Sequence, residues 1–239
     1  MIGTLYGIGV GPGDPELMTL KAVRTLEKVD VLCVPKSKVD KDSLAFSIVE
    51  QEVKKDFEKL ELIFPMSSDE QVLNKHWDEA TEIVAEKLLQ GKNVAFVTIG
   101  DPMFYSTYAY VLVRIKSRHP EIKVVTVPGV PAFAASTSFL NDTLCEGEEK
   151  VAVIPAAYNI DQIKEILERF EVVVMMKVNR NFDQIVETLG DMGLKDKAVY
   201  VSRCGYPDQY YTTDLDSLIG KTKDYMSILF VKKAGWRLP

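Results

Sequence analysis

The segment Gly7-Ile8-Gly9-Val10-Gly11-Pro12-Gly13-Asp14 decides how this chain of 239 residues folds. It closes an expected strand, Thr4–Val10, and leads into an expected helix that reaches about Lys28. Glycines let a backbone approach a ligand closely, and the unpaired amides of such a turn can meet that ligand. The same segment could instead be a tight strand–helix turn whose glycines serve geometry alone. Loop shape does not separate these two interpretations.

Two common nucleotide-binding loops are excluded by the residues of this segment. A dinucleotide fingerprint needs its third glycine at position 12, where the chain has Pro12. Because proline has no amide hydrogen and a fixed φ, the usual pyrophosphate cradle cannot form. No Gly-Lys-Ser/Thr directly follows, which also excludes a P-loop.

Strand-like and helix-like segments alternate outward from this loop. Apolar runs predict buried strands, and apolar residues at helical spacing predict helices. In the first half the expected strands are Val31–Val34, Leu60–Phe64, Val94–Thr98 and Lys123–Val127, and the expected helices are Ser43–Val53, Asp69–Gln90 and Ser106–Ser117. In the second half the expected strands are Val151–Ile154, Val172–Met176, Lys197–Val201 and Ser227–Val231, with helices near Asp161–Arg169 and Asn181–Leu189.

This alternation predicts an α/β fold with a mainly parallel sheet in the first half. The final strands, with Tyr210-Tyr211 close before them, are expected to form an antiparallel hairpin region. His119-Pro120 stops a helix, so the domain boundary is expected within Arg118–Lys123. The predicted domains are therefore 1–120, which holds the glycine-rich loop, and 121–239.

Composition bounds the partners and the compartment. The net charge is −6, and no basic tract is present, which argues against DNA or RNA as a partner while leaving room for a small anionic substrate. Cys33, Cys145 and Cys204 lie far apart, so we expect neither a disulfide framework nor a zinc cluster. We expect no leader and no membrane span, and a cytoplasmic protein.

Two further motifs begin where expected strands end. They are Thr98-Ile99-Gly100-Asp101-Pro102-Met103-Phe104-Tyr105-Ser106-Thr107 and Val127-Pro128-Gly129-Val130-Pro131-Ala132. Open α/β sheets commonly bind ligands at such strand ends. Because Asp101 precedes a proline it is pushed toward an extended conformation that presents its carboxylate. The alternative is that Asp101 caps the following helix.

In this order and spacing, the three motifs resemble those of the tetrapyrrole methylases, a family of S-adenosylmethionine-dependent methyltransferases. That family carries a GxGxGPGD loop near its N-terminus, a later GDP segment and a PG(V/I) turn before a helix. The resemblance extends from residue 3 to the final strand. The segments 11–22 and 100–107, with 34–38 and 43–45, look most like the branch that methylates C-20 of precorrin-2 or cobalt-factor II. Siroheme-branch enzymes usually have Gly-Arg where this chain has Ser106-Thr107.

The resemblance implies two α/β domains, with S-adenosylmethionine in the cleft between them and S-adenosylhomocysteine as its product. It also implies a homodimer. The cofactor-binding residues expected on this basis are Pro12, Ile99, Gly100, Asp101, Phe104, Pro131, Ala132 and Met176. The substrate-binding residues expected beside them are Gly9, Gly11, Gly13, Asp14, Tyr105 and Ser106. Pro131 stands where relatives often have Thr or Ser, and Lys177 where they commonly have glycine.

Early corrinoid precursors of this class carry acetate and propionate arms, so their site needs local cations. Lys36 and Lys38, with Lys41, form the densest candidate group, and Pro35 holds its start rigid. Charge-assisted contacts are about twice as strong as neutral ones, so two lysines could orient the ring. The alternative is a solvated loop, the commoner fate of surface lysines.

Few catalytic side chains are expected, because a sulfonium methyl is already activated and positioning supplies much of the acceleration. The sequence predicts no metal site and no covalent nucleophile, and it leaves the proton-accepting base unassigned. His76 and His119 are expected to be surface or structural residues. Other functions of the same fold stay open: siroheme-precursor synthesis, diphthine synthesis, ribosomal-RNA methylation, or binding without catalysis. The sequence also leaves open whether the ring already holds cobalt.

Overall fold

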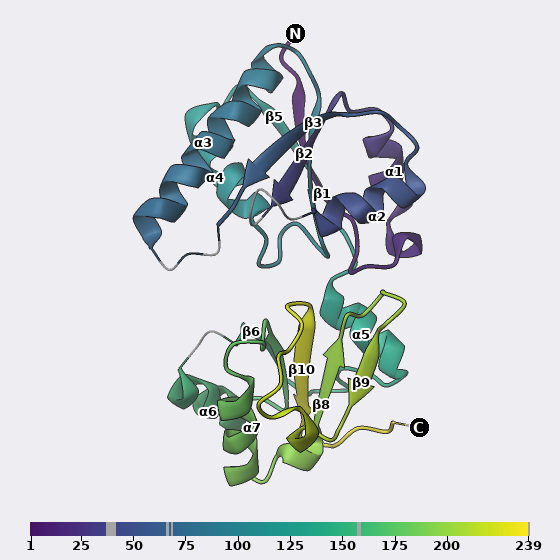
Figure 1. Cartoon of the computed structure of the whole chain (residues 1–239), viewed down its shortest axis with the longest axis vertical. Helices are drawn as coiled ribbons and strands as arrows, with labels where there is room; N and C mark the ends of the chain where they lie inside the picture. Colours follow the sequence, from purple (N-terminus) through teal and green to yellow (C-terminus); the bar gives the residue numbers. More distant parts are fainter. Residues whose placement is uncertain (37–41, 66, 68, 157–158, 239) are drawn as a thin grey trace. The chain divides into compact units, whose positions relative to one another are not determined.

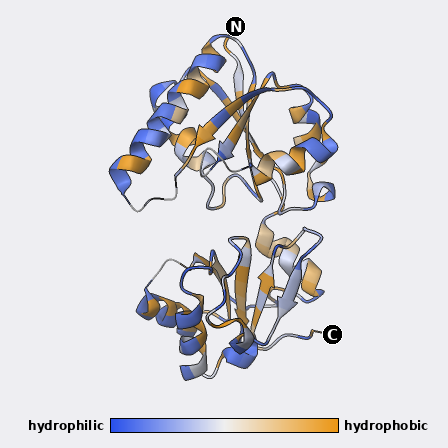
Figure 2. Cartoon of the chain, viewed as in Figure 1, coloured by the Kyte–Doolittle hydropathy of each residue, from blue (hydrophilic) through white to orange (hydrophobic). Residues whose placement is uncertain are grey.

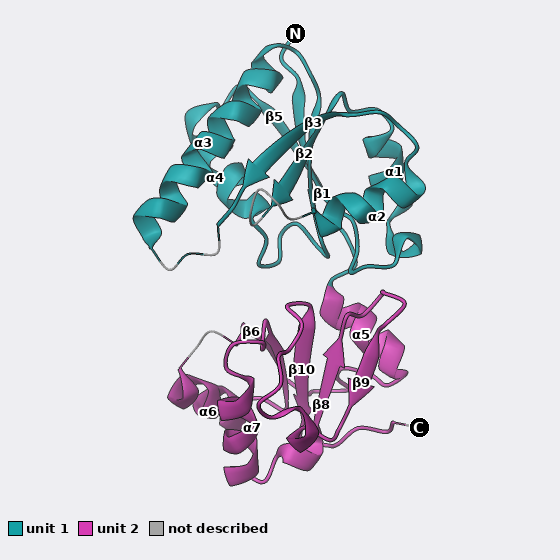
Figure 3. Ribbon diagram, viewed as in Figure 1, with its two compact units in different colours: residues 1–131 teal, residues 132–239 magenta. Residues whose placement is uncertain are grey.

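The computed structural model describes residues 1–36, 42–65, 67, 69–156 and 159–238, and the chain divides into two compact units, 1–131 and 132–239 (Figure 3). The division falls later than the expected boundary at 120/121. The reason is that the strand Lys123–Val127 pairs with the first strand of the chain and so belongs to the first sheet.

Unit 1 contains a five-stranded sheet in the order β3-β2-β4-β1-β5 (Figure 1). Its strands are β1 (Thr4–Gly9), β2 (Val31–Lys36), β3 (Glu58–Ile63), β4 (Val94–Thr98) and β5 (Lys123–Val127). Every neighbouring pair is parallel, which confirms the expected parallel sheet. The central strand β4 is buried along its whole length, as expected for a sheet covered on both faces.

Helices cover both faces of this sheet. They are α1 (Leu20–Leu26) and α2 (Leu44–Glu52) on one face, and α3 (Glu70–Leu89) and α4 (Tyr108–Arg118) on the other. Alternating strand residues divide between the two cores: Ile8 packs with α1 and α2, and Leu5 packs with α3 and α4. The helix expected after the glycine-rich loop is split, because a 3-10 helix, Pro15–Leu17, precedes α1 and Thr19 caps α1 afresh.

Unit 2 contains a mixed sheet in the order β6-β7-β10-β8-β9. Its strands are β6 (Val151–Pro155), β7 (Val172–Met176), β8 (Ala198–Ser202), β9 (Tyr210–Thr212) and β10 (Ser227–Lys232). Its helices are α5 (Ala132–Leu140), α6 (Ile160–Arg169) and α7 (Phe182–Asp191), with 3-10 helices Lys195–Lys197 and Asp216–Leu218. β6 and β7 are parallel, whereas β8, β9 and β10 pair antiparallel, which confirms the expected hairpin region.

The core of each unit follows the apolar pattern of its strands. Figure 2 shows mostly apolar residues along β10, whereas β3, α3 and α6 mix polar and apolar residues along their length. In unit 2, α6 and α7 pack on one face of the sheet. On α5, Phe139 meets Tyr211 of β9 with ring centroids 5.8 Å apart. Within the described ranges no helix has both the length and the apolar character needed to cross a bilayer.

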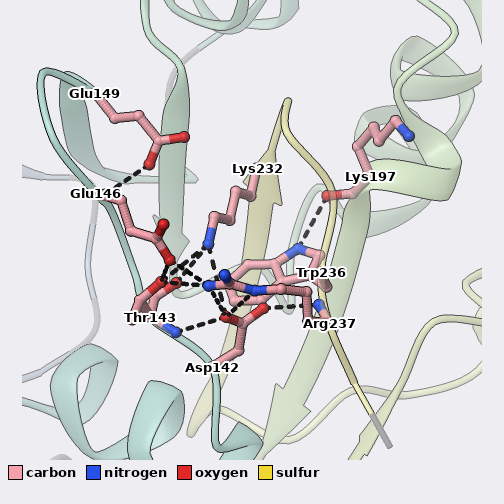
Figure 4. A network of polar contacts seen from close by, with 8 residues as sticks. All are labelled: Asp142, Thr143, Glu146, Glu149, Lys197, Lys232, Trp236 and Arg237. Atoms are coloured by element: carbon pink, nitrogen blue, oxygen red, sulfur yellow. Dashed lines mark hydrogen bonds and ion pairs between the residues drawn. The ribbon is translucent and has the colours of Figure 1, made fainter.

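A buried charge network joins the loop after α5 to the last residues described (Figure 4). The carboxylate of Asp142 accepts hydrogen bonds from the backbone N–H of Arg237 at 2.8 Å and from its guanidinium at 2.7 Å. The Nζ atom of Lys232 donates to the carbonyl oxygen of Thr143 at 2.8 Å and lies 3.8 Å from Asp142. The Asp142 and Lys232 side chains are only 2% and 3% exposed, so the network fixes the C-terminal segment to unit 2.

Candidate active site at the carboxyl ends of β1, β4 and β5

The three sequence motifs meet at one edge of the unit 1 sheet. β1 lies between β4 and β5 and runs parallel to both, so the carboxyl ends of the three strands share that edge. The N–H of Gly100 donates to the carbonyl oxygen of Gly11 at 2.7 Å, and the N–H of Val10 donates to that of Thr98 at 3.0 Å. The glycine-rich loop and the GDP loop are thus joined where parallel sheets commonly bind ligands.

Gly9 of the glycine-rich loop and Gly129 of the Pro-Gly turn pack closely against each other and against the GDP loop. A Cβ atom on Gly9 would lie 2.5 Å from the carbonyl oxygen of Gly100 and 2.7 Å from the amide nitrogen of Gly129. A Cβ atom on Gly129 would lie 2.2 Å from the same oxygen. Because the obstructing atoms are backbone, only glycine fits at these two positions. Gly11 has a φ of +79°, which glycine adopts without strain. Close backbone packing and a positive φ therefore explain why Gly9, Gly11 and Gly129 are glycines, without a bound ligand.

The rest of the glycine-rich loop is buried and locally capped. Pro12 and Gly13 are buried, whereas Asp14 is half-buried. The Oδ1 atom of Asp14 accepts a hydrogen bond from the N–H of Glu16 at 2.9 Å and caps the 3-10 helix that Pro15 begins. The structure thus gives Asp14 a local role, and its contact with substrate stays a prediction.

The carboxylate of Asp101 braces two loops. Its Oδ1 atom accepts from the N–H of Met103 at 2.8 Å, and its Oδ2 atom accepts from the N–H of Gly129 at 3.0 Å. The alternative that Asp101 caps the following helix is wrong, since α4 begins at Tyr108 and its preceding residue is Thr107. Asp101 instead sets the distance between the GDP loop and the Pro-Gly turn.

The GDP loop presents aromatic and apolar side chains. Tyr105 has a φ of +50° and is 45% exposed, and its ring meets that of Phe104 edge-on at 4.9 Å. A non-glycine residue in this region of φ is uncommon and marks local strain, which is frequent at ligand sites. Ile99 and Phe104 are half-buried, and the Ser106 hydroxyl donates to the carbonyl oxygen of Pro102 at 2.6 Å. The loop therefore offers an apolar surface with few free polar groups.

The side chain of Tyr108, the first residue of α4, packs against β1 and β5 of the same sheet. Its ring is fully buried and fills the space over Gly7, where a Cβ atom would lie 2.1 Å from the ring. Its hydroxyl lies 3.1 Å from Oγ1 of Thr126, and burial raises the pKa of the phenol. Sequence reasoning did not assign Tyr108 a role. The available signal was the glycine inside a strand, which often marks a close approach of another group.

The basic loop after β2 is only partly described. The Nζ atom of Lys36 lies 2.6 Å from the Oε1 atom of Glu61 on the neighbouring strand β3, and the Lys36 side chain is 12% exposed. Lys36 therefore already has a carboxylate partner within the chain. Lys38 and Lys41 lie outside the described residues.

The remaining cofactor-site predictions fall at the start of unit 2 and within it. Pro131 is the last residue of unit 1, and Ala132 begins both unit 2 and α5; both are half-buried. Met176 ends β7, is half-buried, and its carbonyl oxygen accepts from the N–H of Ala156 at 2.7 Å. Lys177, which follows, has a φ of +59°. No contact with a cofactor is assigned to these residues by the fold, and their roles stay predictions.

Titratable candidates for catalysis are few. Burial raises the pKa of the Cys33 thiol and of the Cys204 thiol, so neither is an activated thiolate. Among the described residues, no three His, Cys, Asp or Glu side chains gather into a group that could hold a metal ion. This edge of unit 1 therefore consists of tightly packed backbone, the hydrogen-bonded Asp101 carboxylate and apolar side chains.

The glycine-rich loop is thus bonded to the GDP loop at the carboxyl edge of a parallel sheet, and a second α/β unit follows in the chain. The chain matches the tetrapyrrole (corrin/porphyrin) methylases over residues 4–219, and it belongs to that family.

Two curated relatives align along nearly their whole length. The chain is 34% identical over 238 residues to a probable cobalt-precorrin-2 C(20)-methyltransferase from Methanocaldococcus jannaschii, covering 98% of this chain and 97% of the relative. It is 32% identical over 244 residues to a precorrin-2 C(20)-methyltransferase from Sinorhizobium sp., covering 99% and 97%.

Solved structures share the fold at lower identity. A cobalt precorrin-4 methyltransferase superposes with a TM-score of 0.73 and 20% identity, covering 97% of this chain and 95% of the other. Uroporphyrin-III C-methyltransferase from Thermus thermophilus, solved in complex with S-adenosylhomocysteine, gives a TM-score of 0.67 at 18% identity and covers 97% and 98%. These likenesses agree with the α/β fold expected from the sequence.

Proposed function

We propose that this protein transfers a methyl group from S-adenosylmethionine to C-20 of an early corrin-ring precursor, precorrin-2 or cobalt-factor II, in cobalamin biosynthesis. The observation that carries the proposal is the sequence similarity to two relatives that are both named C(20)-methyltransferases. The chain is 34% and 32% identical to them over 98% and 99% of its length. The Ser106-Thr107 pair after the GDP motif supports the same branch over siroheme synthesis.

The unit 1 edge fits such a cofactor in its chemistry. When bound, S-adenosylmethionine supplies a methyl group on sulfonium sulfur, which needs no further activation. The half-buried Ile99 and Phe104 offer apolar surface of the kind that lines small-molecule sites. The Asp101 carboxylate is occupied by the amides of Met103 and Gly129, so it holds the loop shape and does not need the ligand as a partner.

Positioning is the catalytic contribution that these residues suit. Alignment of two reactants at about 3–3.5 Å can remove about 7–11 kcal/mol from a barrier. Loops fixed by backbone contacts at Gly9, Gly100 and Gly129 can hold such an alignment, because none of the three can shift without disturbing the others. Ala132 and Met176 are proposed to contribute further cofactor contacts from unit 2. A cytoplasmic homodimer is part of the proposal.

The deciding experiment supplies methyl-labelled S-adenosylmethionine with precorrin-2, cobalt-factor II or uroporphyrinogen III in parallel. Label at C-20 of one of the first two, located by carbon NMR, is the expected result and also tells whether cobalt is required. Label on uroporphyrinogen III alone would instead assign the protein to siroheme-precursor synthesis. Transfer to none of the three, in protein that binds the cofactor, would contradict the proposal.

A separate measurement addresses macromolecular partners. With a net charge of −6 we expect no RNA binding at physiological salt. Filter binding with ribosomal RNA across a salt series tests this. Micromolar, salt-sensitive binding would favour the RNA-methylating alternative. Light scattering of the purified protein tests the proposed dimer.

A further inference from the structure

Among the residues that the structure describes, four non-glycine residues have a positive φ, and three of them either tolerate this conformation or have side-chain contacts nearby. Asn141 directly follows the last residue of α5, and asparagine tolerates this conformation. Tyr105 packs against Phe104 in the GDP loop. Arg203 follows β8, and its guanidinium bonds Asp208 and Asp224 and covers the ring of Tyr206. The fourth residue, Lys177, has no such contact with the other residues that the structure describes.

Lys177 stands where the chain turns sharply after β7. The next residue, Val178, is fully buried in the unit 2 core, so the turn is needed to return the chain to that core. Glycine would make the same turn with φ at +59° and no strain, whereas lysine strains it. Non-glycine residues that persist in this conformation cluster at ligand sites. The turn therefore explains the conformation but not the choice of lysine.

The side chain of Lys177 is also costly where it lies. It is half-buried, and it forms no hydrogen bond or ion pair with any other residue that the structure describes. Burial lowers the pKa of its ammonium, and within the described ranges no carboxylate opposes that shift. A partly desolvated cation without a counter-charge is unfavourable in the free protein. By contrast, Lys232 is almost fully buried in the same unit but donates to Thr143 close to Asp142.

Lys177 also lies at the edge of unit 2 where ligands are expected. β7 and β8 both pair antiparallel with β10, so they are parallel to each other and their carboxyl ends share one edge with that of β6. Lys177 follows the end of β7 at this edge, directly after Met176.

We infer that the Lys177 ammonium binds a carboxylate of a ligand at this edge, and that the ligand supplies the counter-charge missing from the protein. The inference rests on the proposed function, which offers two sources of that group. One is the acetate and propionate arms of the tetrapyrrole, and the other is the amino-acid carboxylate of S-adenosylmethionine. Ligand binding would then compensate for the backbone strain at Lys177 and for the partial burial of its ammonium.

Three variants at position 177 separate the effect of the lysine charge from the effect of the backbone strain. Lys177→Met removes the ammonium, Lys177→Gly removes the ammonium and the strain, and Lys177→Arg keeps a cation. The matched control is Lys221→Met, an exposed lysine of unit 2. For each protein we would measure the Kd of S-adenosylmethionine by calorimetry, KM and kcat for the tetrapyrrole, and the urea midpoint of unfolding.

We expect Lys177→Met and Lys177→Gly to weaken one of the two ligands by roughly tenfold or more, the loss of one charge-assisted hydrogen bond. A rise in tetrapyrrole KM at nearly constant kcat assigns the contact to the substrate, and a rise in cofactor Kd assigns it to S-adenosylmethionine. Lys177→Arg should retain most of the affinity. Lys177→Gly should unfold at a higher urea concentration than the wild type, and Lys221→Met should match the wild type throughout.

Unchanged KM and unchanged Kd in folded Lys177→Met and Lys177→Gly would overturn the inference. Failure of the proposed function looks different, because the wild type itself would then methylate neither corrinoid precursor. In that case the cofactor titration still tests Lys177 against the carboxylate of S-adenosylmethionine, and unchanged Kd would overturn the inference there too.

Discussion

The Oδ2 atom of Asp101 accepts a hydrogen bond from the backbone N–H of Gly129 at 3.0 Å, across a separation of 28 residues. The other carboxylate oxygen accepts from Met103, so one side chain spans the loops that leave β4 and β5. Those strands do not pair with each other, since β1 lies between them. Asp101 thereby connects two loops that the sheet itself holds apart.

This brace predicts the outcome of Asp101→Asn. The amide keeps one oxygen but turns an N–H₂ group toward one of the two donors, which leaves that donor unpaired. We expect the unfolding free energy to fall by about 1–3 kcal/mol, measured by urea denaturation. Asp14→Asn is the matched control, because asparagine caps a helix about as well as aspartate. Equal stability of Asp101→Asn and wild type would show that the brace contributes nothing.

Gly9→Ala is expected to be far more damaging than its size suggests. The added Cβ would lie 2.5 Å from a backbone oxygen and 2.7 Å from a backbone nitrogen, and neither can move freely. We expect a loss of about 3 kcal/mol or more, at the upper end for overpacking. In Gly190→Ala the new Cβ would lie 3.4 Å from the flexible end of Lys195, within α7. That control should be neutral or stabilise by up to about 1 kcal/mol. Similar destabilisation by both changes would contradict this account.

Apart from β9, the strands of both units could be predicted from the sequence, because apolar runs bounded by turn residues give a local signal. β9 is three residues long, too short to give such a run, and is not among the expected strands. The helix α5 could not be predicted from periodicity, although the family pattern placed a helix after the Pro-Gly turn. Its sequence, AFAASTSFL, is rich in small and hydroxyl residues, so no polar face alternates with an apolar one. The expected domain boundary at 120/121 came from the helix stop at His119-Pro120, and the pairing of β5 with β1 was not visible locally.

For the candidate site, the motifs could be found but their contacts could not. The approach of Gly9 to Gly129 and the brace from Asp101 depend on the strand order β4-β1-β5, which is a non-local property. The ion pair between Lys36 and Glu61 depends in the same way on the β2–β3 register. The spacing of residues along the chain does not encode these pairings. The sequence alone therefore cannot distinguish a residue that pairs within the protein from one that binds a ligand.

Variants of Lys36 can separate its ion pair with Glu61 from its predicted contact with the tetrapyrrole. Lys36→Glu should lower the unfolding free energy by about 0.5–1 kcal/mol, because two carboxylates would then face each other on β2 and β3. The swap Lys36→Glu with Glu61→Lys should restore stability. If Lys36 also orients the tetrapyrrole, KM stays raised in the swap while cofactor affinity is unchanged. A normal KM in the swap would assign Lys36 to strand pairing alone.

Ala132→Trp tests the cofactor contact proposed for the start of α5. Ala132 is half-buried at the first position of that helix, so a large ring there changes local shape without entering either core. We expect cofactor binding, measured by calorimetry, to be lost while the circular dichroism spectrum is retained. Leu20→Trp is the control, since Leu20 is 73% exposed on α1. Unchanged affinity in folded Ala132→Trp would remove this residue from the proposed site.

Asp142 should give unit 2 a specific acid sensitivity. Burial alone would raise the pKa of its carboxyl, but hydrogen bonds from Arg237 and from the N–H of Thr143 outweigh burial and hold that pKa at about 2. Since the folded pKa lies below the ordinary value of 3.8, the unfolded chain binds the proton more tightly. The stabilisation is therefore complete above about pH 4 and is lost as the pH falls toward 2.

The two tryptophans allow this to be measured for unit 2 alone, because Trp77 lies in unit 1 and Trp236 in unit 2. In a Trp77→Phe background, Trp236 fluorescence in urea gives the unfolding free energy between pH 6 and pH 2. Asp142→Asn should lose about 2 kcal/mol at neutral pH, because the amide cannot replace the charge-assisted hydrogen bonds from Arg237 or the charge that faces Lys232. It should also show a flatter decline below about pH 4, since no carboxylate is left there to protonate. Glu187→Gln, an exposed residue of α7, should follow the wild-type curve. Parallel curves for Asp142→Asn and wild type would show that acid unfolding is governed by other carboxylates.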